Sequence, residues 1–173
     1  FTVLPSTLPG KLQIHDEDPY QLQYANGTWF LHIGDTGYRY VVASEKLWQP
    51  YIDQSVAQGT TKIRVWFCEG RSDIAAVFGI GQQLNVSYWQ WMERRIMYAL
   101  AKYPHVILEV ILYGEDSNRL KAYATDELIQ YVGRYAQARW SSFPNIYWML
   151  SNDQHIGARI PWQVINHIGE DML

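Results

Sequence analysis

At 173 residues the chain is long enough for one sizeable domain with its own hydrophobic core. Its 48% hydrophobic and 18% charged residues are ordinary for a globular domain. The net charge is −3, and the sequence has no lysine- or arginine-rich block. Nothing in the charge pattern therefore indicates binding to nucleic acid or to a membrane. Eight Trp and thirteen Tyr stand out. They fit either a Trp-rich core or aromatic platforms for a flat ligand such as a sugar.

The first predicted element is a short β-hairpin arm over residues 21–33. Two alternating segments flank Asn26-Gly27, the pair favoured in type I′ turns. The second arm, about residues 28–35, is predicted to be the first strand of the main sheet. A helix is then expected from an N-cap at Ser44 up to Gly59, because apolar residues recur at helical spacing.

The strand-then-helix pattern then repeats along the chain. Strands are predicted at about residues 61–68, 105–113 and 145–151, and helices at 87–103, 120–142 and from Pro161 to the end. Helical connections of this length require a parallel sheet with right-handed crossovers. The predicted fold class is therefore α/β. Residues 20–173 supply four βα units behind an N-terminal extension at 1–19, either in a doubly wound sheet or in half of a barrel.

Polar residues at the strand ends favour the (β/α)8 TIM barrel over the open sheet. The predicted strands finish in Asp35, Glu69, Glu115 with Asp116, and Asn152 with Asp153. In a barrel these ends converge on one face, where the active site lies, whereas an open sheet concentrates function at one switch point. No glycine-rich phosphate motif follows a strand, which weakens a nucleotide-binding interpretation.

Charged and aromatic residues also lie inside the predicted strands. Alternation places Arg64 and Trp66 on one face of the second strand, and Glu109 and Tyr113 on one face of the third. Because both faces of a parallel strand are normally buried, we expect Arg64 and Glu109 to pair inside the barrel. The pair could form the floor of a substrate pocket or have only a structural role. Trp66 and Tyr113 are the predicted sugar platforms, since they lie near strand ends.

Asp153 is the candidate catalytic carboxylate. Glycoside hydrolysis needs two carboxyl groups across the scissile bond, and Asp153 directly follows a predicted buried strand at the barrel mouth. The competing interpretation is that residues 151–153 only cap the next segment, as Ser, Asn and Asp do. Trp148 is expected to face the helices, and Cys68 to be a buried, inert thiol. The histidines lack metal-ligand spacing, so neither a metal nor another cofactor is expected.

Two segments resemble one known family. Residues 20–36 (YQLQYANGTWFLHIGDT) and 131–153 (YVGRYAQARWSSFPNIYWMLSND) are similar to the apiosidase-like glycoside hydrolases. These are barrel enzymes of clan A, with relatives named as cellulases or glycosidases. The resemblance covers roughly residues 18–156, nearly the whole chain.

The resemblance implies roles for three residues. The fourth strand of clan A barrels ends in Asn-Glu, and Asn152-Asp153 stands there in this sequence. An Asp at this position also resembles the apiosidase-like branch. Acid/base work is thereby implied for Asp153 and sugar contact for Asn152. Asp35 is expected to line the substrate pocket or to brace its floor.

The clan's nucleophile lies at the end of the seventh strand, and no residue here matches it. The resemblance thus implies the N-terminal half of a retaining glycosidase acting on plant or microbial polysaccharide side chains. A half barrel exposes two strand edges, so we expect a missing C-terminal half-barrel or a second copy to complete the fold. The chain alone is expected to be inactive, and a secreted or periplasmic location is expected. The alternative is a non-catalytic carbohydrate-binding or scaffold barrel module.

Overall fold

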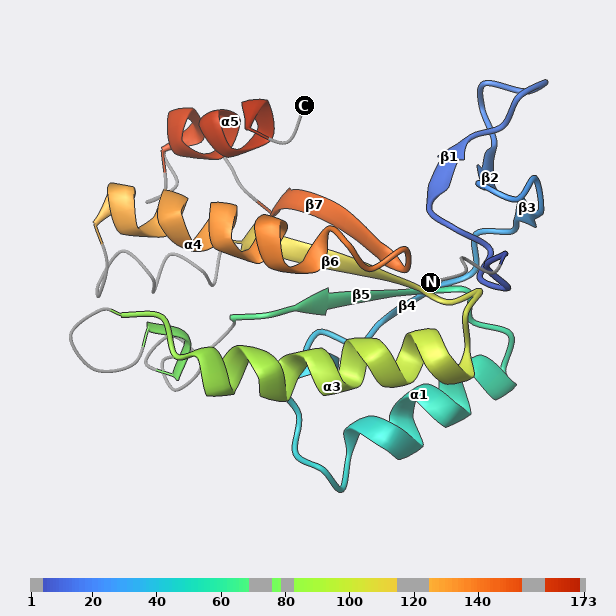
Figure 1. Cartoon of the computed structure of the whole chain (residues 1–173), viewed down its shortest axis with the longest axis horizontal. Coiled ribbons are helices and arrows are strands. Elements are labelled where there is room, and N and C mark those ends of the chain that lie inside the picture. Colours follow the sequence, from blue (N-terminus) through green and yellow to red (C-terminus); the bar gives the residue numbers. More distant parts are fainter. Residues whose placement is uncertain (1–4, 69–75, 79–82, 115–124, 154–160, 172–173) are drawn as a thin grey trace.

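The computed structural model describes residues 5–68, 76–78, 83–114, 125–153 and 161–171. Its main element is a parallel sheet in the order β4-β5-β6-β7, made of β4 (Gly34–Thr36), β5 (Lys62–Trp66), β6 (Ile107–Gly114) and β7 (Ile146–Asn152). The helical segments are η1 (Tyr40–Val42) and α1 (Trp48–Ala57) after β4, α3 (Val86–Lys102) before β6, α4 (Asp126–Trp140) before β7, and α5 (Trp162–Glu170) after it. Strands adjacent in sequence are adjacent in space (Figure 1), as the βα repeats predict.

The main core lies between one face of this sheet and the helices. Alternate residues of β5 and β6 enter it, such as Ile63 and Val110, and every α-helix contributes apolar side chains. Trp89 and Trp140 are fully buried within it. Much of the tryptophan content therefore serves the core. Cys68 is a buried free thiol in the same cluster, as predicted.

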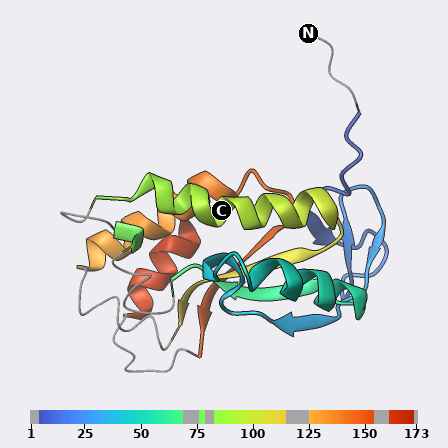
Figure 2. The same cartoon turned by 90° about the horizontal axis from the view of Figure 1, so that it is seen from below.

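The side chain of Trp148 points from β7 toward the helices, as predicted. Its ring stacks on Trp140 of α4 with 6.5 Å between centroids and 8° between planes. Its indole N–H donates to Ser141 Oγ at 3.1 Å. Trp148 therefore packs against the helix-side core while staying partly buried, on the face that the alternation predicts. Elsewhere in the helical layer α1 and α3 run side by side (Figure 2), joined by hydrogen bonds from Tyr98 and Lys102 to Asp53.

A small antiparallel sheet covers the end of the parallel sheet where its strands begin. It contains β1 (Leu12–Ile14), β2 (Leu22–Tyr24) and β3 (Trp29–Phe30), in that order. Tyr24 and Phe30 pack on Ile107, the first residue of β6, and the Tyr24 hydroxyl donates to the His105 carbonyl. Figures 1 and 2 both show this sheet at one end of the molecule. The carboxyl ends of the parallel strands, where a barrel places its active site, lie at the other end.

The hairpin prediction is confirmed, but its second arm is divided between the two sheets. Residues 25–27 form the turn between β2 and β3, with Gly27 at a φ of +82°; Asn26 does not have a positive φ, so the turn is not the type I′ turn that Asn26-Gly27 favours. The strand predicted over 28–35 consists of β3, which pairs antiparallel with β2, and β4, which pairs parallel with β5. An alternating pattern is common to both kinds of pairing, so the sequence did not reveal the division.

The starts of α3 and α5 lie within one residue of the prediction, whereas α1 and α4 begin later than predicted, α4 at Asp126 and not near residue 120. The first helix begins at Trp48 and not beside Ser44, whose carbonyl accepts from the N–H groups of Leu47 and Trp48 in the turn that leads into the helix. Asn85 and Thr125 cap α3 and α4, each accepting a backbone N–H through its side chain.

Candidate functional site

The face of the sheet away from the helices carries a connected set of polar side chains. Arg64 of β5 lies directly opposite Glu109 of β6, and its Nε donates to Glu109 Oε2 at 2.9 Å. The predicted Arg64–Glu109 pair is therefore confirmed. Lys62, two residues earlier on β5, donates from Nζ to Glu109 Oε1 at 2.8 Å. Each oxygen of this buried carboxylate is thus held by its own cation.

From Arg64 the contacts continue to the end of β7. Arg64 Nη1 donates to Asn152 Oδ1 at 3.4 Å, and Asn152 Nδ2 donates to Asp153 Oδ2 at 2.6 Å. Asn152 is buried, whereas Asp153 is exposed. We call Lys62, Glu109, Arg64, Asn152 and Asp153 the polar column. It leads from the start of β5 to an exposed carboxylate at the carboxyl end of β7.

The charges in the polar column stabilise one another. Burial alone would raise the pKa of Glu109, but hydrogen bonds and charge attraction from Lys62 and Arg64 lower it overall. The pKa of Arg64 is raised, chiefly by its hydrogen bond to Glu109. Close to them, the pKa of His32 is lowered by desolvation and by the Lys62 charge. At neutral pH the centre of the column is therefore an ionised carboxylate between two cations, beside a neutral imidazole.

Asp153 has an unusual backbone conformation. Its φ of +54° is the one positive value at a non-glycine position among the described residues. The left-handed region is unfavourable for most side chains, although Asp tolerates it better than bulky residues. Such conformations concentrate at functional sites, where surrounding contacts hold them. Here the conformation carries the carboxylate past the last residue of β7 and back onto the Asn152 amide.

Asp35 faces the helices and not the polar column. Its Oδ2 accepts from Tyr51 Oη at 2.8 Å and Ser55 Oγ at 3.0 Å, both in α1, and its Oδ1 accepts from Thr36 N–H at 2.7 Å. The Tyr51 hydrogen bond is the main reason why the pKa of Asp35 is lowered. Asp35 was expected either to line the substrate pocket or to brace its floor. These contacts favour the bracing role, because they join α1 to β4.

Replacing Asp35 should therefore affect stability. Asp35→Ala removes the acceptor of two side-chain hydroxyls, which should lower the free energy of unfolding by about 1–3 kcal/mol. Urea unfolding of the natural protein and the variant measures this. Sugar affinity of the folded variant should stay unchanged, and a selective loss of affinity would instead place Asp35 in the substrate site.

The two predicted sugar platforms are covered. Tyr113 is fully buried in the helix-side core, where its hydroxyl donates to the Ile129 carbonyl of α4 at 2.7 Å. Its predicted inward orientation is therefore wrong, since its ring lies on the helix side of the sheet. Trp66 is 4% exposed, with its ring 5.0 Å from that of Tyr38. Neither ring presents an open face to a ligand.

Two residues near the Arg64–Glu109 pair were missed by sequence reasoning. Lys62 shares the alternating face of Arg64, so the same rule that selected Arg64 could have found it. Tyr147 lies opposite Glu109 on β7 and is 44% exposed. It is an exposed aromatic residue beside that pair, and the strand register was needed to place it there.

Some predicted features lie outside the described residues, among them Glu69, Glu115 and Asp116. Within the described residues no group of three or more His, Cys, Asp or Glu side chains could hold a metal ion. None of the helices in the described part of the chain is long and apolar enough to cross a membrane.

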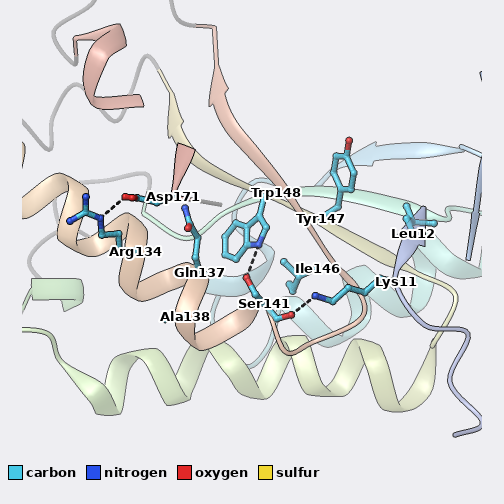
Figure 3. A pocket seen from close by; sticks show the side chains of 10 residues that line it. All are labelled: Lys11, Leu12, Arg134, Gln137, Ala138, Ser141, Ile146, Tyr147, Trp148 and Asp171. Atoms are coloured by element: carbon cyan, nitrogen blue, oxygen red, sulfur yellow. Dashed lines mark hydrogen bonds and ion pairs between the residues drawn. The ribbon is translucent and has the colours of Figure 1, made fainter. Parts of the chain in front are cut away.

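A pocket of about 790 Å³ lies beside β7, at the edge of the sheet. Figure 3 shows Trp148 and Tyr147 pointing in opposite directions from this strand, with Trp148 directed at Ser141. Lys11 also lines the pocket, and its ammonium group donates to the Ser141 carbonyl. No member of the polar column lines this pocket. The pocket is therefore distinct from the polar column, although Tyr147, which lies opposite Glu109, lines it.

Comparison with solved structures defines the class of fold. The chain resembles a glycoside hydrolase family 5 structure from Bacteroides vulgatus with a TM-score of 0.74 at 17% identity, covering 97% of this chain and 39% of that one. It also resembles an endo-1,4-beta-mannanase from Rhizomucor miehei with a TM-score of 0.54 at 12% identity, covering 88% of this chain and 54% of that one. The four-stranded parallel sheet is thus a partial match to the TIM-barrel glycoside hydrolases, and the chain spans well under two thirds of their length.

The family follows from the sequence. Residues 16–172 match the apiosidase-like catalytic domain, and the chain belongs to this glycoside hydrolase family. No curated protein matches the chain by sequence. The match covers the candidate site, from β4 to the residues after β7.

Proposed function

We propose that this domain carries the acid/base residue of a retaining glycoside hydrolase that acts on plant or microbial polysaccharide side chains. The observation that supports it best is the exposed Asp153 carboxylate, which lies at the carboxyl end of a parallel strand and is hydrogen-bonded to Asn152. Membership of the apiosidase-like family supports a carbohydrate substrate.

In the proposed reaction Asp153 acts twice. As the acid it gives its proton to the glycosidic oxygen, so that the leaving sugar departs as a neutral alcohol. As the base it then takes a proton from the water that attacks the glycosyl-enzyme intermediate. Asn152 contacts the sugar 2-hydroxyl, and its hydrogen bond from Arg64 holds the amide for that contact.

The second carboxylate, the nucleophile, is proposed to come from outside these 173 residues. The chain spans 39% of the family 5 structure that it matches. Further polypeptide or a second copy of the chain would complete the barrel and add the nucleophile. Because polysaccharides lie outside the cell, the proposal includes a secreted or periplasmic location.

Release of sugar tests this proposal. The natural full-length protein should cleave activated aryl glycosides of at least one pentose or hexose, while the 173-residue chain alone should release none. The natural protein should also bind the matching oligosaccharide in calorimetric titrations. Sugar binding without turnover would instead support a non-catalytic carbohydrate-binding or scaffold module.

A further inference from the structure

Lys62 and its partner Glu109 are the members of the polar column for which the proposed reaction gives no role. The side chain of Lys62 is 13% exposed, and that of Glu109 is 5% exposed. An ammonium group held away from water is costly unless it is paired. Arg64 already neutralises Glu109, so Lys62 adds a second cation to one carboxylate. The simplest explanation of Lys62 is a stabilising ion pair, but the geometry indicates more.

We propose that Lys62 is a positioning residue for the Asn152–Asp153 pair, acting through Glu109 and Arg64. The inference rests on the proposed function, because it assigns Lys62 to the site that contains the acid/base. The two oxygens of Glu109 accept from different residues. Lys62 takes Oε1 and Arg64 Nε takes Oε2, so the plane of the carboxylate is fixed from two neighbouring positions on β5.

Without Lys62 the carboxylate has a competing arrangement. A carboxylate and a guanidinium group pair preferentially through two parallel hydrogen bonds. Glu109 Oε1, once free, would turn toward a second nitrogen of Arg64. The guanidinium plane would rotate with it, and Nη1 would leave its place 3.4 Å from Asn152 Oδ1. Lys62 prevents this by occupying Oε1.

The orientation of Asn152 depends on that contact. Arg64 has only donors, so the Asn152 amide must present its oxygen to Arg64. The amide nitrogen then faces the other way and donates to Asp153 Oδ2 at 2.6 Å. A reversed amide would set its oxygen against the Asp153 carboxylate, which also only accepts when ionised. The position of Arg64 therefore decides which way Asn152 holds Asp153.

The test uses Lys62→Met, which keeps the length of the side chain and removes its charge, in the natural full-length protein. With 15N in asparagine side chains, the Asn152 amide resonances should shift and broaden in Lys62→Met and recover in Lys62→Arg. For turnover, kcat should fall by about tenfold or more with little change in KM, because a displaced catalytic group loses rate more than binding. Lys62→Arg should restore most of kcat.

Lys102→Met is the matched control. Lys102 also pairs with a carboxylate, that of Asp53, but it lies on the helical layer away from the column. This variant should leave the Asn152 resonances and kcat at their original values. If Lys62→Met does not fold, the comparison is made in the Glu109→Gln background, where Lys62→Met should add no further shift of the Asn152 amide because Lys62 acts through Glu109; a further shift would contradict this route.

Unchanged Asn152 resonances in folded Lys62→Met would overturn the inference and leave Lys62 as a stabilising ion pair. An equal loss of kcat in Lys62→Arg and Lys62→Met would also overturn it. The proposed function fails in a different way, namely through absence of turnover in the natural protein. In that case the Asn152 resonances still decide whether Lys62 positions this pair.

Discussion

Asp153→Asn should lower kcat/KM of the natural protein by about 10²- to 10⁴-fold on glycosides with poor leaving groups. The amide is nearly the same size as the carboxyl group but has no acidic proton to give. The glycosidic oxygen would then leave as an unprotonated alkoxide, which is the difficult part of the reaction. Steady-state kinetics on an alkyl or sugar-linked glycoside measure the loss.

The leaving group provides an internal control for this variant. A dinitrophenyl glycoside needs no proton to depart, so Asp153→Asn should still release dinitrophenol in the first turnover. Asp16→Asn, an exposed aspartate outside the polar column, should retain full activity on both substrates. Loss of activity independent of the leaving group would contradict the acid/base assignment and indicate a different role for Asp153.

Glu109→Ala should produce the largest loss of stability among the variants considered, about 3–5 kcal/mol in the free energy of unfolding. The variant leaves Lys62 and Arg64 facing each other with no carboxylate between them. Two like charges partly removed from water cannot both be accommodated, so the sheet must open or admit water. Urea unfolding of both proteins at pH 7 measures the difference.

The pH dependence of the same measurement tests its cause. The pKa of Glu109 is lower in the folded state than in the unfolded chain. Its contribution is therefore complete above the unfolded value of about 4.3 and is lost as the pH falls through the folded value. The difference between natural protein and variant should shrink correspondingly in acid.

Asp171→Ala is the matched control for stability. It breaks the ion pair between Asp171 and Arg134, whose side chains are largely exposed. Surface pairs of this kind contribute within about 1 kcal/mol, so little should change. Equal effects of the two variants would mean that burial does not strengthen the Glu109 pairs.

The sequence predicts the order of the elements well because periodicity reports burial directly. The strands predicted over 61–68, 105–113 and 145–151 appear as β5, β6 and β7 with small shifts at their ends. The Arg64–Glu109 pair was predictable for the same reason, since a charge on a doubly buried strand needs a partner. The site could be predicted to this extent from alternation alone.

The remaining features depend on information that alternation does not contain. Tyr113 has the right spacing for the inner face, but its ring lies on the helix side of the sheet, where its hydroxyl donates to a carbonyl of α4. Asp35 stands at the end of the predicted strand, but its carboxylate accepts hydrogen bonds from the hydroxyl groups of α1 and not from the polar column. Tyr147 depends on the register between β6 and β7. Each outcome is decided by a partner far away in the sequence.

The most direct test of the whole account is a crystal structure of the natural protein carrying Asp153→Asn, with a bound oligosaccharide. If Asp153 is the acid/base residue, the glycosidic oxygen should lie within hydrogen-bonding distance of residue 153, and a sugar 2-hydroxyl should contact Asn152. A sugar bound only in the pocket beside β7, away from the polar column, would contradict that role.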